Sequence, residues 1–311
     1  MTEPYTADYV WMDGGLVPWD QALVHVNLLG HATVSSVYEG IKAYWNVNAK
    51  QLFLFRLDDH LQRFKESIKM VRLNCQYSLD DLRKATLTLV LANEAREDFY
   101  VTPLIYKTGV LRWYSFPDLD HTTDVVIDMW PFTSHMTTER SINACVSSWT
   151  RLSDNSSSNR IKCVSNYHNG RMASIEAALN GYDAAIMLND RGKVSEEPGA
   201  CLFLVRKGKV VTPSITSDIL ESITRDTILR VCTEVLRIPT EERDVDRTEL
   251  YIADEVFFCG TGREVLPVAS VDRLPVGDGQ MGPITKAIDQ AYHDIVRGID
   301  AHYDEWRTPV W

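Results

Sequence analysis

Lys162 stands in an unusual setting for a lysine, within the stretch RIKCVSNYHNGRMASIEA at positions 160–177. It lies between Ile161 and Cys163 in a mostly uncharged run, five residues before Tyr167. A lysine among small and apolar residues is costly to charge, so its pKa tends to fall. Such a lysine can form a Schiff base, and a nearby phenol could hydrogen-bond a cofactor oxygen. From these residues alone, a loop lysine beside a core tyrosine is the competing interpretation.

Two adjacent acids, Glu196 and Glu197, follow in the stretch VSEEPG. Neighbouring residues on an extended chain point in opposite directions, so at most one of the two is expected to face inward and the other to be solvated. A buried glutamate needs a cationic partner, and a protonated pyridine nitrogen would serve. A solvated turn is the alternative interpretation.

Two further stretches could bind an anion. In SITRDT, the Thr224 hydroxyl and the N–H groups of a helix start form a possible anion site. In CGTGRE, a strand that ends in Gly-Thr-Gly at positions 260–262 lets backbone N–H groups approach an anion closely. Most such turns bind nothing, but two in one domain favour a bound phosphate. Arg63, in DDHLQRFKES, is by itself an ordinary exposed helix arginine.

The first part of the chain mixes helical and strand-like segments. An apolar face of Leu61, Phe64, Ile68 and Val71 predicts an amphipathic helix over 58–73. A second helix is expected over 80–96, and strand-like runs flank the pair at 52–55, 103–110 and 124–130. This mixture indicates an α/β or α+β domain.

The hydroxyl-rich stretch PFTSHMTTER, 131–140, is typical of a linker, so we expect domains over 1–130 and 141–311. In the second domain we expect a strand over 184–188 and a turn at 189–192. A hairpin over 201–213 should turn at Lys207–Gly208. A strand over 255–259, a helix over 225–236 with Thr224 as its N-cap, and a final helix from 284 to about 303 should follow.

Composition excludes several classes of function. The net charge of −11 over 311 residues argues against nucleic acid as a partner. The six cysteines contain no CxxC pair, which suits neither zinc nor a disulfide framework and favours reduced thiols in the cytoplasm. The N-terminus is acidic and polar, unlike a signal peptide, and no uncharged apolar run approaches the roughly 18 residues of a membrane span. Motifs for dinucleotide, P-loop, zinc-hydrolase and serine-hydrolase chemistry are missing.

Taken together and in order, seven blocks resemble the branched-chain aminotransferase family. This is the fold type IV group of pyridoxal-phosphate enzymes, which also holds D-amino-acid and (R)-amine transaminases. The resemblance runs from about residue 9 to about residue 273. The blocks are HVNLLGHATVSSVYEGIKAYW, FRLDDHLQRFKESIKMVRL, VSSWTR, IKCVSNYHN, GYDAAIMLNDRGKVSEEPGACLFLV, ESITRDTIL and EVFFCGTGREVLPV.

The resemblance implies roles for individual residues. Lys162 matches the lysine that forms the internal aldimine with pyridoxal 5′-phosphate. Tyr167 matches the tyrosine that hydrogen-bonds the phenolic oxygen of the cofactor, and Glu196 matches the glutamate that pairs with its pyridine nitrogen. The phosphate cup matches at Arg63, Ile223 (through its backbone), Thr224 and Thr261.

The resemblance also implies an architecture and a reaction. Two α/β domains hold the cofactor between them, in a homodimer or a higher homo-oligomer whose partner chain helps to line the pocket. An amino group moves from a donor to a 2-oxo acid in two half-reactions, through pyridoxamine phosphate and with no metal. Glu197 falls where the family usually has glycine, so it is expected to remain solvated.

The substrate pocket departs from the family pattern. Thr102, in YVTP, replaces the usual arginine, and TGVLRW introduces Arg112 and Trp113 where a glycine-rich turn is usual. Thr33 stands where a tyrosine is usual, although Tyr38 and Gly40 agree with the pattern.

Two hypotheses for the substrate follow. In the first, the substrate carboxylate docks on the Thr261–Gly262 amides with Tyr100, and branched-chain amino acids are accepted. In the second, the enzyme is an (R)-selective amine:pyruvate transaminase in which Arg112 is a movable partner for the carboxylate. A lyase of the aminodeoxychorismate type, which uses the same cofactor for elimination, is a more distant alternative.

Overall fold

The computed structural model describes residues 7–28, 33–108, 122–138 and 140–311. These residues divide into two compact units. Unit 1 takes the described residues up to Ser134 together with Ile161–Ser165 and Val296–Trp311, and unit 2 takes His135–Arg160 and Asn166–Ile295. The range 141–311, expected from the sequence to form one domain, is therefore shared between the two units.

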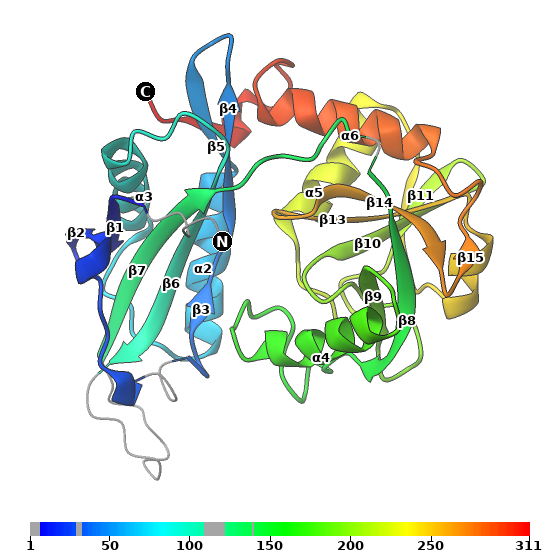
Figure 1. Ribbon diagram of the computed structural model, residues 1–311, viewed down its shortest axis with the longest axis horizontal. Coiled ribbons are helices and arrows are strands. Elements are labelled where there is room, and N and C mark those ends of the chain that lie inside the picture. The colour runs from blue at the N-terminus through cyan, green and yellow to red at the C-terminus, as the bar shows by residue number, and fades with distance from the viewer. Residues whose placement is uncertain (1–6, 29–32, 109–121, 139) are drawn as a thin grey trace. The chain divides into compact units, whose positions relative to one another are not determined.

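Unit 1 is built on one sheet of eight strands in the order β16-β5-β4-β6-β7-β1-β2, with β3 paired to β6 (Figure 1). Every pairing in this sheet is antiparallel. The strands are β1 (Tyr9–Met12), β2 (Gly15–Pro18), β3 (Val37–Tyr38), β4 (Ile41–Asn46), β5 (Gln51–Phe55), β6 (Phe99–Thr108), β7 (Thr122–Pro131) and β16 (Arg307–Pro309).

Helices α2 (Leu57–Met70) and α3 (Leu79–Ala92) pack on this sheet through one continuous hydrophobic core. The buried side chains of α2 include Leu61, Phe64 and Ile68, the apolar face that the sequence predicts. Single 3₁₀ turns complete the unit at η1 (Trp19–Gln21), η2 (Val26–Leu28) and η5 (Asp304–Trp306).

Unit 2 is built on a mixed sheet of eight strands in the order β12-β11-β10-β13-β14-β8-β9, with β15 paired to β14. The β8–β9, β8–β14 and β11–β12 pairs are parallel, and the others are antiparallel. The strands are β8 (Ile142–Thr150), β9 (Ala184–Leu188), β10 (Cys201–Arg206), β11 (Lys209–Thr212), β12 (Thr240–Glu242), β13 (Glu255–Gly260), β14 (Glu264–Val271) and β15 (Leu274–Pro275).

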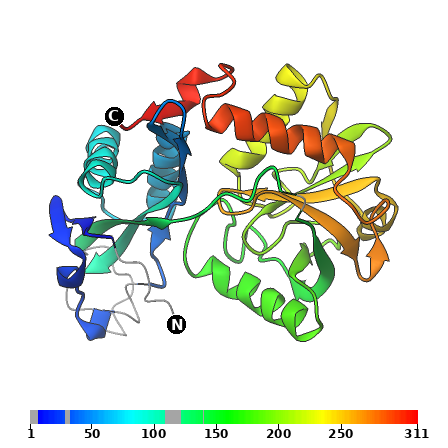
Figure 2. The ribbon, with the colours of Figure 1, turned by 45° about the horizontal axis from the view of Figure 1, so that its top comes forward.

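Helices cover both sides of this sheet. Helix α4 (Asn166–Leu179) packs against β8 and β9, whereas α5 (Ile223–Arg230) and α6 (Pro283–Val296) lie on the other side (Figures 1 and 2). A π-helical segment, η3 (Val231–Val235), continues α5, and η4 (Arg247–Ile252) precedes β13.

The predicted helices all occur, but their ends differ. Helix α2 ends at Met70 because Arg72 has a left-handed backbone, φ +58°. Helix α6 ends at Val296, two residues before Gly298 at φ +67°, and not near residue 303 as expected. The N-cap prediction at Thr224 is wrong. Helix α5 begins at Ile223, and the Ser222 side chain caps it by accepting a hydrogen bond from the Arg225 N–H.

The predicted strands over 52–55, 124–130, 184–188 and 255–259 and the predicted hairpin are confirmed. The strand expected over 103–110 is confirmed as far as Thr108, and residues 109–110 lie outside the described residues. β10 and β11 turn at Lys207 and Gly208, whose φ angles of +51° and +75° suit a tight hairpin turn. All six cysteines are unpaired. Among the described residues, no helix is long and apolar enough to cross a membrane, and no cluster of side chains could hold a metal ion.

Candidate active site

Lys162 belongs to a five-residue segment that is anchored in unit 1 although its chain neighbours lie in unit 2. The Tyr38 N–H donates to the Lys162 carbonyl (3.2 Å), and the Lys162 N–H donates to Ser67 Oγ on α2 (3.2 Å). One residue further, the Val164 N–H donates to the Ser36 carbonyl (2.9 Å). The backbone of the lysine is therefore fixed between β3 and α2.

The side chain of Lys162 is half-buried beside an aromatic ring. Its Nζ lies 4.5 Å from the centroid of the Tyr38 ring, within the range of a cation–π contact. The structure thus brings two predicted site residues, the lysine and Tyr38, into direct contact.

Arg63, which the sequence alone presents as an ordinary surface arginine, is held by a buried carboxylate. Its Nε donates to Glu39 Oε1 (2.7 Å) and its Nη2 donates to Glu39 Oε2 (2.8 Å). His60 Nδ1 lies 2.8 Å from the same Oε2. Glu39 is fully buried. A buried, bidentate pair of this kind fixes the guanidinium in one orientation.

The titration behaviour of this cluster follows from its burial. Burial would raise the pKa of Glu39, but the charge of Arg63 and the hydrogen bonds from His60 and Arg63 outweigh it and hold the pKa well below its usual range. Burial lowers the pKa of His60, and the charges of Arg63 and Lys162 lower it further, against the opposing effect of Glu39. His60 is therefore a neutral donor at neutral pH.

Gly40 and Tyr100 are also brought together. A Cβ atom at position 40 would lie 1.8 Å from the Tyr100 hydroxyl oxygen, so only glycine allows this approach. Tyr100 stacks on Trp130 with ring centroids 5.2 Å apart. Thr102, two residues along β6, has a buried Oγ1 with no hydrogen-bond partner among the described residues. Arg112 and Trp113 lie outside the described residues.

The remaining described residues with a predicted role lie in unit 2, on or beside segments that approach Glu196 or the turn that follows it. The Leu220 N–H, two residues before the cap of α5, lies 3.2 Å from both oxygens of Glu196. Helix α4, which carries half-buried Tyr167 in its first turn, approaches the same turn, since a Cβ at Gly170 would lie 2.8 Å from Pro198 Cβ.

Glu196 is a buried acid with one strong partner. Arg151 Nη2 donates to its Oε1 at 2.5 Å, and both side chains are over 90% buried. Burial raises the pKa of Glu196, while the charge of Arg151 and the hydrogen bonds from Leu220 N–H and Arg151 oppose that rise. Arg151 Nε and Nη1 are buried without a hydrogen-bond partner among the described residues.

Glu197 contradicts its prediction. Its side chain is 4% exposed and not solvated; it accepts from Arg263 Nη2 (2.7 Å) and from the Gly199 N–H (2.7 Å). Both adjacent acids are buried because the chain turns sharply after Glu196, which lets the second carboxylate find its own partners. Alternation along a straight strand does not apply there.

Two further pairs of predicted residues, in the first turn of α5 and in the turn between β13 and β14, lie in unit 2. Ile223 and Thr224 form the first turn of α5, where N–H groups have no partner within the helix itself. Thr261 and Gly262 lie in the turn between β13 and β14 and are half-buried. This turn touches the one after Glu196, since a Cβ at Gly260 would lie 3.4 Å from the Gly199 carbonyl oxygen.

These residues fit the chemistry of pyridoxal 5′-phosphate. A fixed guanidinium and the start of a capped helix are donors for a phosphate. Glu196 would be a buried acceptor for a protonated ring nitrogen, and Lys162 would supply a primary amine. The carbonyl-reactive amine, the phosphate donors and the acid are thus all present in the described chain.

The sequence missed three residues of the site: Glu39, His60 and Arg151. The only local signal was charge or polarity in otherwise apolar strand and helix faces, and such patterns do not say which partner a side chain meets.

Comparison with known proteins agrees with this geometry. The family model described as class IV aminotransferase matches residues 36–271. A probable branched-chain-amino-acid aminotransferase of Aquifex aeolicus is 35% identical over 100% of this chain and 99% of its own.

Solved structures give the same result. A branched-chain amino acid aminotransferase from Thermobaculum terrenum, solved in its PLP-form, is 44% identical and superposes with a TM-score of 0.95 over 98% of this chain and 99% of its own. The branched-chain amino acid aminotransferase of Escherichia coli is 36% identical, with a TM-score of 0.92 over 98% and 100% of the two chains. The chain belongs to the class IV aminotransferases, in their branched-chain aminotransferase-like group of fold type IV.

Proposed function

We propose that this pyridoxal-phosphate-dependent aminotransferase moves the amino group of a branched-chain amino acid to a 2-oxo acid. The observation that carries the proposal is the likeness over nearly the whole chain to proteins that bear this name, together with the buried acid, the fixed arginine and the amine described above. Neither alternative, the (R)-selective amine:pyruvate transaminase or the lyase, is favoured by these relatives.

The residues of this chain take the following roles in the proposal. Arg63, the first turn of α5 (Ile223 and Thr224) and Thr261 hold the phosphate. Glu196 accepts from the ring nitrogen and Tyr167 binds the phenolic oxygen. When bound, the cofactor supplies a carbonyl for Schiff-base chemistry and a ring that takes up the electron pair of the substrate Cα. Lys162 Nζ is the base that removes the Cα proton.

The substrate residues form a second part of the proposal. The Thr261 and Gly262 amides, with Tyr100, receive the substrate carboxylate, while Tyr38, Gly40 and Thr102 shape the pocket. Arg112 is a further candidate partner for the carboxylate. We also propose that the protein is a cytoplasmic homodimer or higher homo-oligomer, which light scattering of the purified enzyme would test.

An absorbance spectrum of the purified protein tests the proposal first. We expect a yellow band that bleaches on addition of L-leucine, with Lys162→Ala abolishing both the band and turnover. Exposed Lys69 on α2 offers a matched control, and Lys69→Ala should leave both unchanged. Bleaching only with (R)-1-phenylethylamine or with a D-amino acid would refute the branched-chain assignment, and no yellow band even with added cofactor would refute the role of Lys162.

A further inference from the structure

Glu197 is a buried acid that none of the proposed roles uses. Each of its two oxygens has one donor: Oε2 accepts from the Gly199 N–H and Oε1 from Arg263 Nη2, both at 2.7 Å. The side chain of Arg263 is 39% exposed, whereas that of Glu197 is 4% exposed. The carboxylate is therefore the fixed member of the pair, and the arginine is the member that it holds.

The pair links two turns, one that directly follows Glu196 and one that contains Thr261 and Gly262. The first turn, Glu197 to Ala200, directly follows Glu196 and is closed by the Glu197 N–H donating to the Ala200 carbonyl (2.9 Å). The second turn joins β13 to β14 and contains Thr261 and Gly262. Gly260 lies close to Gly199, since a Cβ atom at position 260 would lie 3.4 Å from the Gly199 carbonyl oxygen, and Arg263 adds a charged side-chain link.

The far end of the second turn is fastened by another buried acid. Glu264, which is fully buried and has a left-handed backbone (φ +51°), accepts from the His135 N–H at 2.9 Å. Arg263 and Glu264 are consecutive, so the contacts with Glu197 and His135 both fasten the end of the turn that leads into β14. The other end is fixed at Gly260, which pairs with Glu264 across β13 and β14, so the peptide planes of Thr261 and Gly262 are restricted from both sides.

We propose that Glu197 is a positioning residue that acts through Arg263 to orient the Thr261 and Gly262 N–H groups toward the carboxylate of the amino acid or 2-oxo acid. The inference rests on the proposed docking of that carboxylate. Donors fixed before the ligand arrives bind it more strongly than donors that must be ordered on binding.

The test uses the holoenzyme and the variant Glu197→Gln, which keeps the volume but removes the charge. The probe is 4-methylvaleric acid, a carboxylate that cannot react and that is present in a solved structure of another branched-chain amino acid aminotransferase. We expect its Kd, and the KM for the 2-oxo acid, to rise about tenfold, the loss of one charge-assisted contact. Because Lys162 and Glu196 are intact, kcat should change less than about threefold. Hydrogen exchange at the Thr261 and Gly262 amides should become faster even without ligand.

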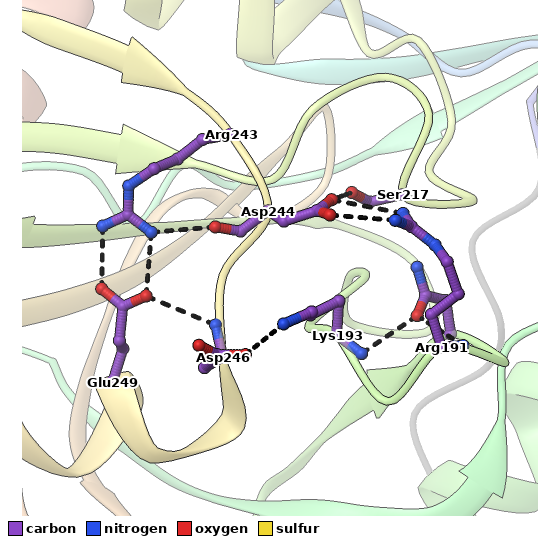
Figure 3. Close-up of polar contacts among 8 residues, drawn as sticks. Arg191, Lys193, Ser217, Arg243, Asp244, Asp246 and Glu249 are labelled. Atoms are coloured by element: carbon purple, nitrogen blue, oxygen red, sulfur yellow. Dashed lines mark hydrogen bonds and ion pairs between the residues drawn. The ribbon is translucent and has the colours of Figure 1, made fainter.

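Two further variants separate positioning from a general loss of stability. Glu249→Gln removes a part-buried acid that pairs with Arg243 at 2.8 Å, in a network of unit 2 that contains no proposed site residue (Figure 3). It should lower stability without changing the Kd of the probe. The double variant Glu197→Ala with Arg263→Ala removes both charges, so no charge is left unpaired, and it should bind the probe as weakly as Glu197→Gln.

Two results would overturn the inference. Unchanged probe affinity and unchanged exchange in Glu197→Gln would mean that the pair does not position the turn. Recovery of wild-type affinity in the double variant would mean that the single variant suffers only from an unpaired charge. If the wild-type holoenzyme binds no 4-methylvaleric acid and does not transaminate L-leucine, the proposed function itself fails, and faster exchange in Glu197→Gln would then show only that the turn is fastened by this pair.

Discussion

At the residue scale, the site depends on acids that are buried together with the cation they hold. Glu39 binds Arg63 through two hydrogen bonds and Glu196 binds Arg151 through one. Removing one partner of such a pair leaves an uncompensated buried charge, which costs far more than the pair contributes. Each pair therefore ties the orientation of a functional side chain to the stability of its unit.

Glu39→Gln should lower the free energy of unfolding by about 3 kcal/mol at pH 7, because Arg63 loses its buried counter-ion. The folded-state pKa of Glu39 lies well below its usual range. Its contribution is therefore complete above the unfolded-state pKa of about 4 and is lost as the pH falls below it, so the difference between variant and wild type should shrink toward pH 3. Urea unfolding at several pH values measures this.

The control for this prediction lies on α2, the helix that carries Arg63. Asp59 pairs with Arg56 at 2.6 Å but its side chain is 47% exposed, so Asp59→Asn should cost less than about 1 kcal/mol. Equal losses in both variants would contradict the view that burial makes the Glu39 contact important.

At the element scale, helix α4 shows what apolar periodicity can and cannot reveal. Its buried face consists of Asn166, Gly170, Ala173 and Ala177, which are small or polar. No large apolar stripe marks this helix, so apolar spacing does not predict it, although it carries Tyr167. Helices α2 and α3 could be predicted because they bury leucines and phenylalanine at helical spacing.

Gly170→Ala tests the close packing of α4. Alanine favours a helix over glycine by about 1 kcal/mol, but its Cβ would lie 2.8 Å from Pro198 Cβ and 3.1 Å from Pro198 Cα. The steric overlap with the rigid proline should outweigh the gain in helix propensity, so the free energy of unfolding should fall by about 1–3 kcal/mol. The affinity for pyridoxal phosphate should also fall, since Pro198 is two residues from Glu196.

Exposed His168 on the same helix provides the comparison, because alanine there meets no packed neighbour and should leave stability and cofactor affinity nearly unchanged. If Gly170→Ala proved as stable as His168→Ala, the packing of α4 against the turn would have to be looser than described.

At the scale of the whole molecule, the sequence predicted the fold class and the family, but not the contacts that the candidate site residues make. Lys162 and Glu196 stand in short recognisable stretches. The residues that pair with the candidate site residues do not stand in such stretches. Glu39 pairs with residues 21 and 24 positions away, and Arg151 pairs with Glu196 across 45 positions. Such pairings are set by strand order, which local patterns do not encode. Glu197 was misjudged because a turn, and not a straight strand, follows Glu196.

Asp289 on α6 should give the stability of the protein a measurable pH dependence. Burial, with the charge of Glu264 adding to it, raises the pKa of Asp289 to about 6, although the Thr137 N–H opposes the rise. The folded state then binds this proton more tightly than the unfolded state, so the free energy of unfolding falls as the pH rises from about 4 to about 6. The change is about 3 kcal/mol.

Asp289→Asn should remove this pH dependence. In urea unfolding experiments, the free energy of unfolding of the variant should therefore rise relative to that of the wild type as the pH rises from about 4 to about 7. Asp278→Asn, at an exposed position, should follow the wild-type profile. A slope that persists in Asp289→Asn would assign it to another group.

The chain passes between the two units four times, at 134–135, 160–161, 165–166 and 295–296. A gene fragment that ends near residue 134 would encode most of unit 1, but it would lack Lys162 and strand β16. Unit 1 is thus assembled from three separate stretches of sequence. Recombination at a single junction cannot replace the whole of unit 1 with the corresponding unit of a relative. An exchange of residues 1–134 alone would therefore separate Lys162 from the helix and strand that hold its backbone.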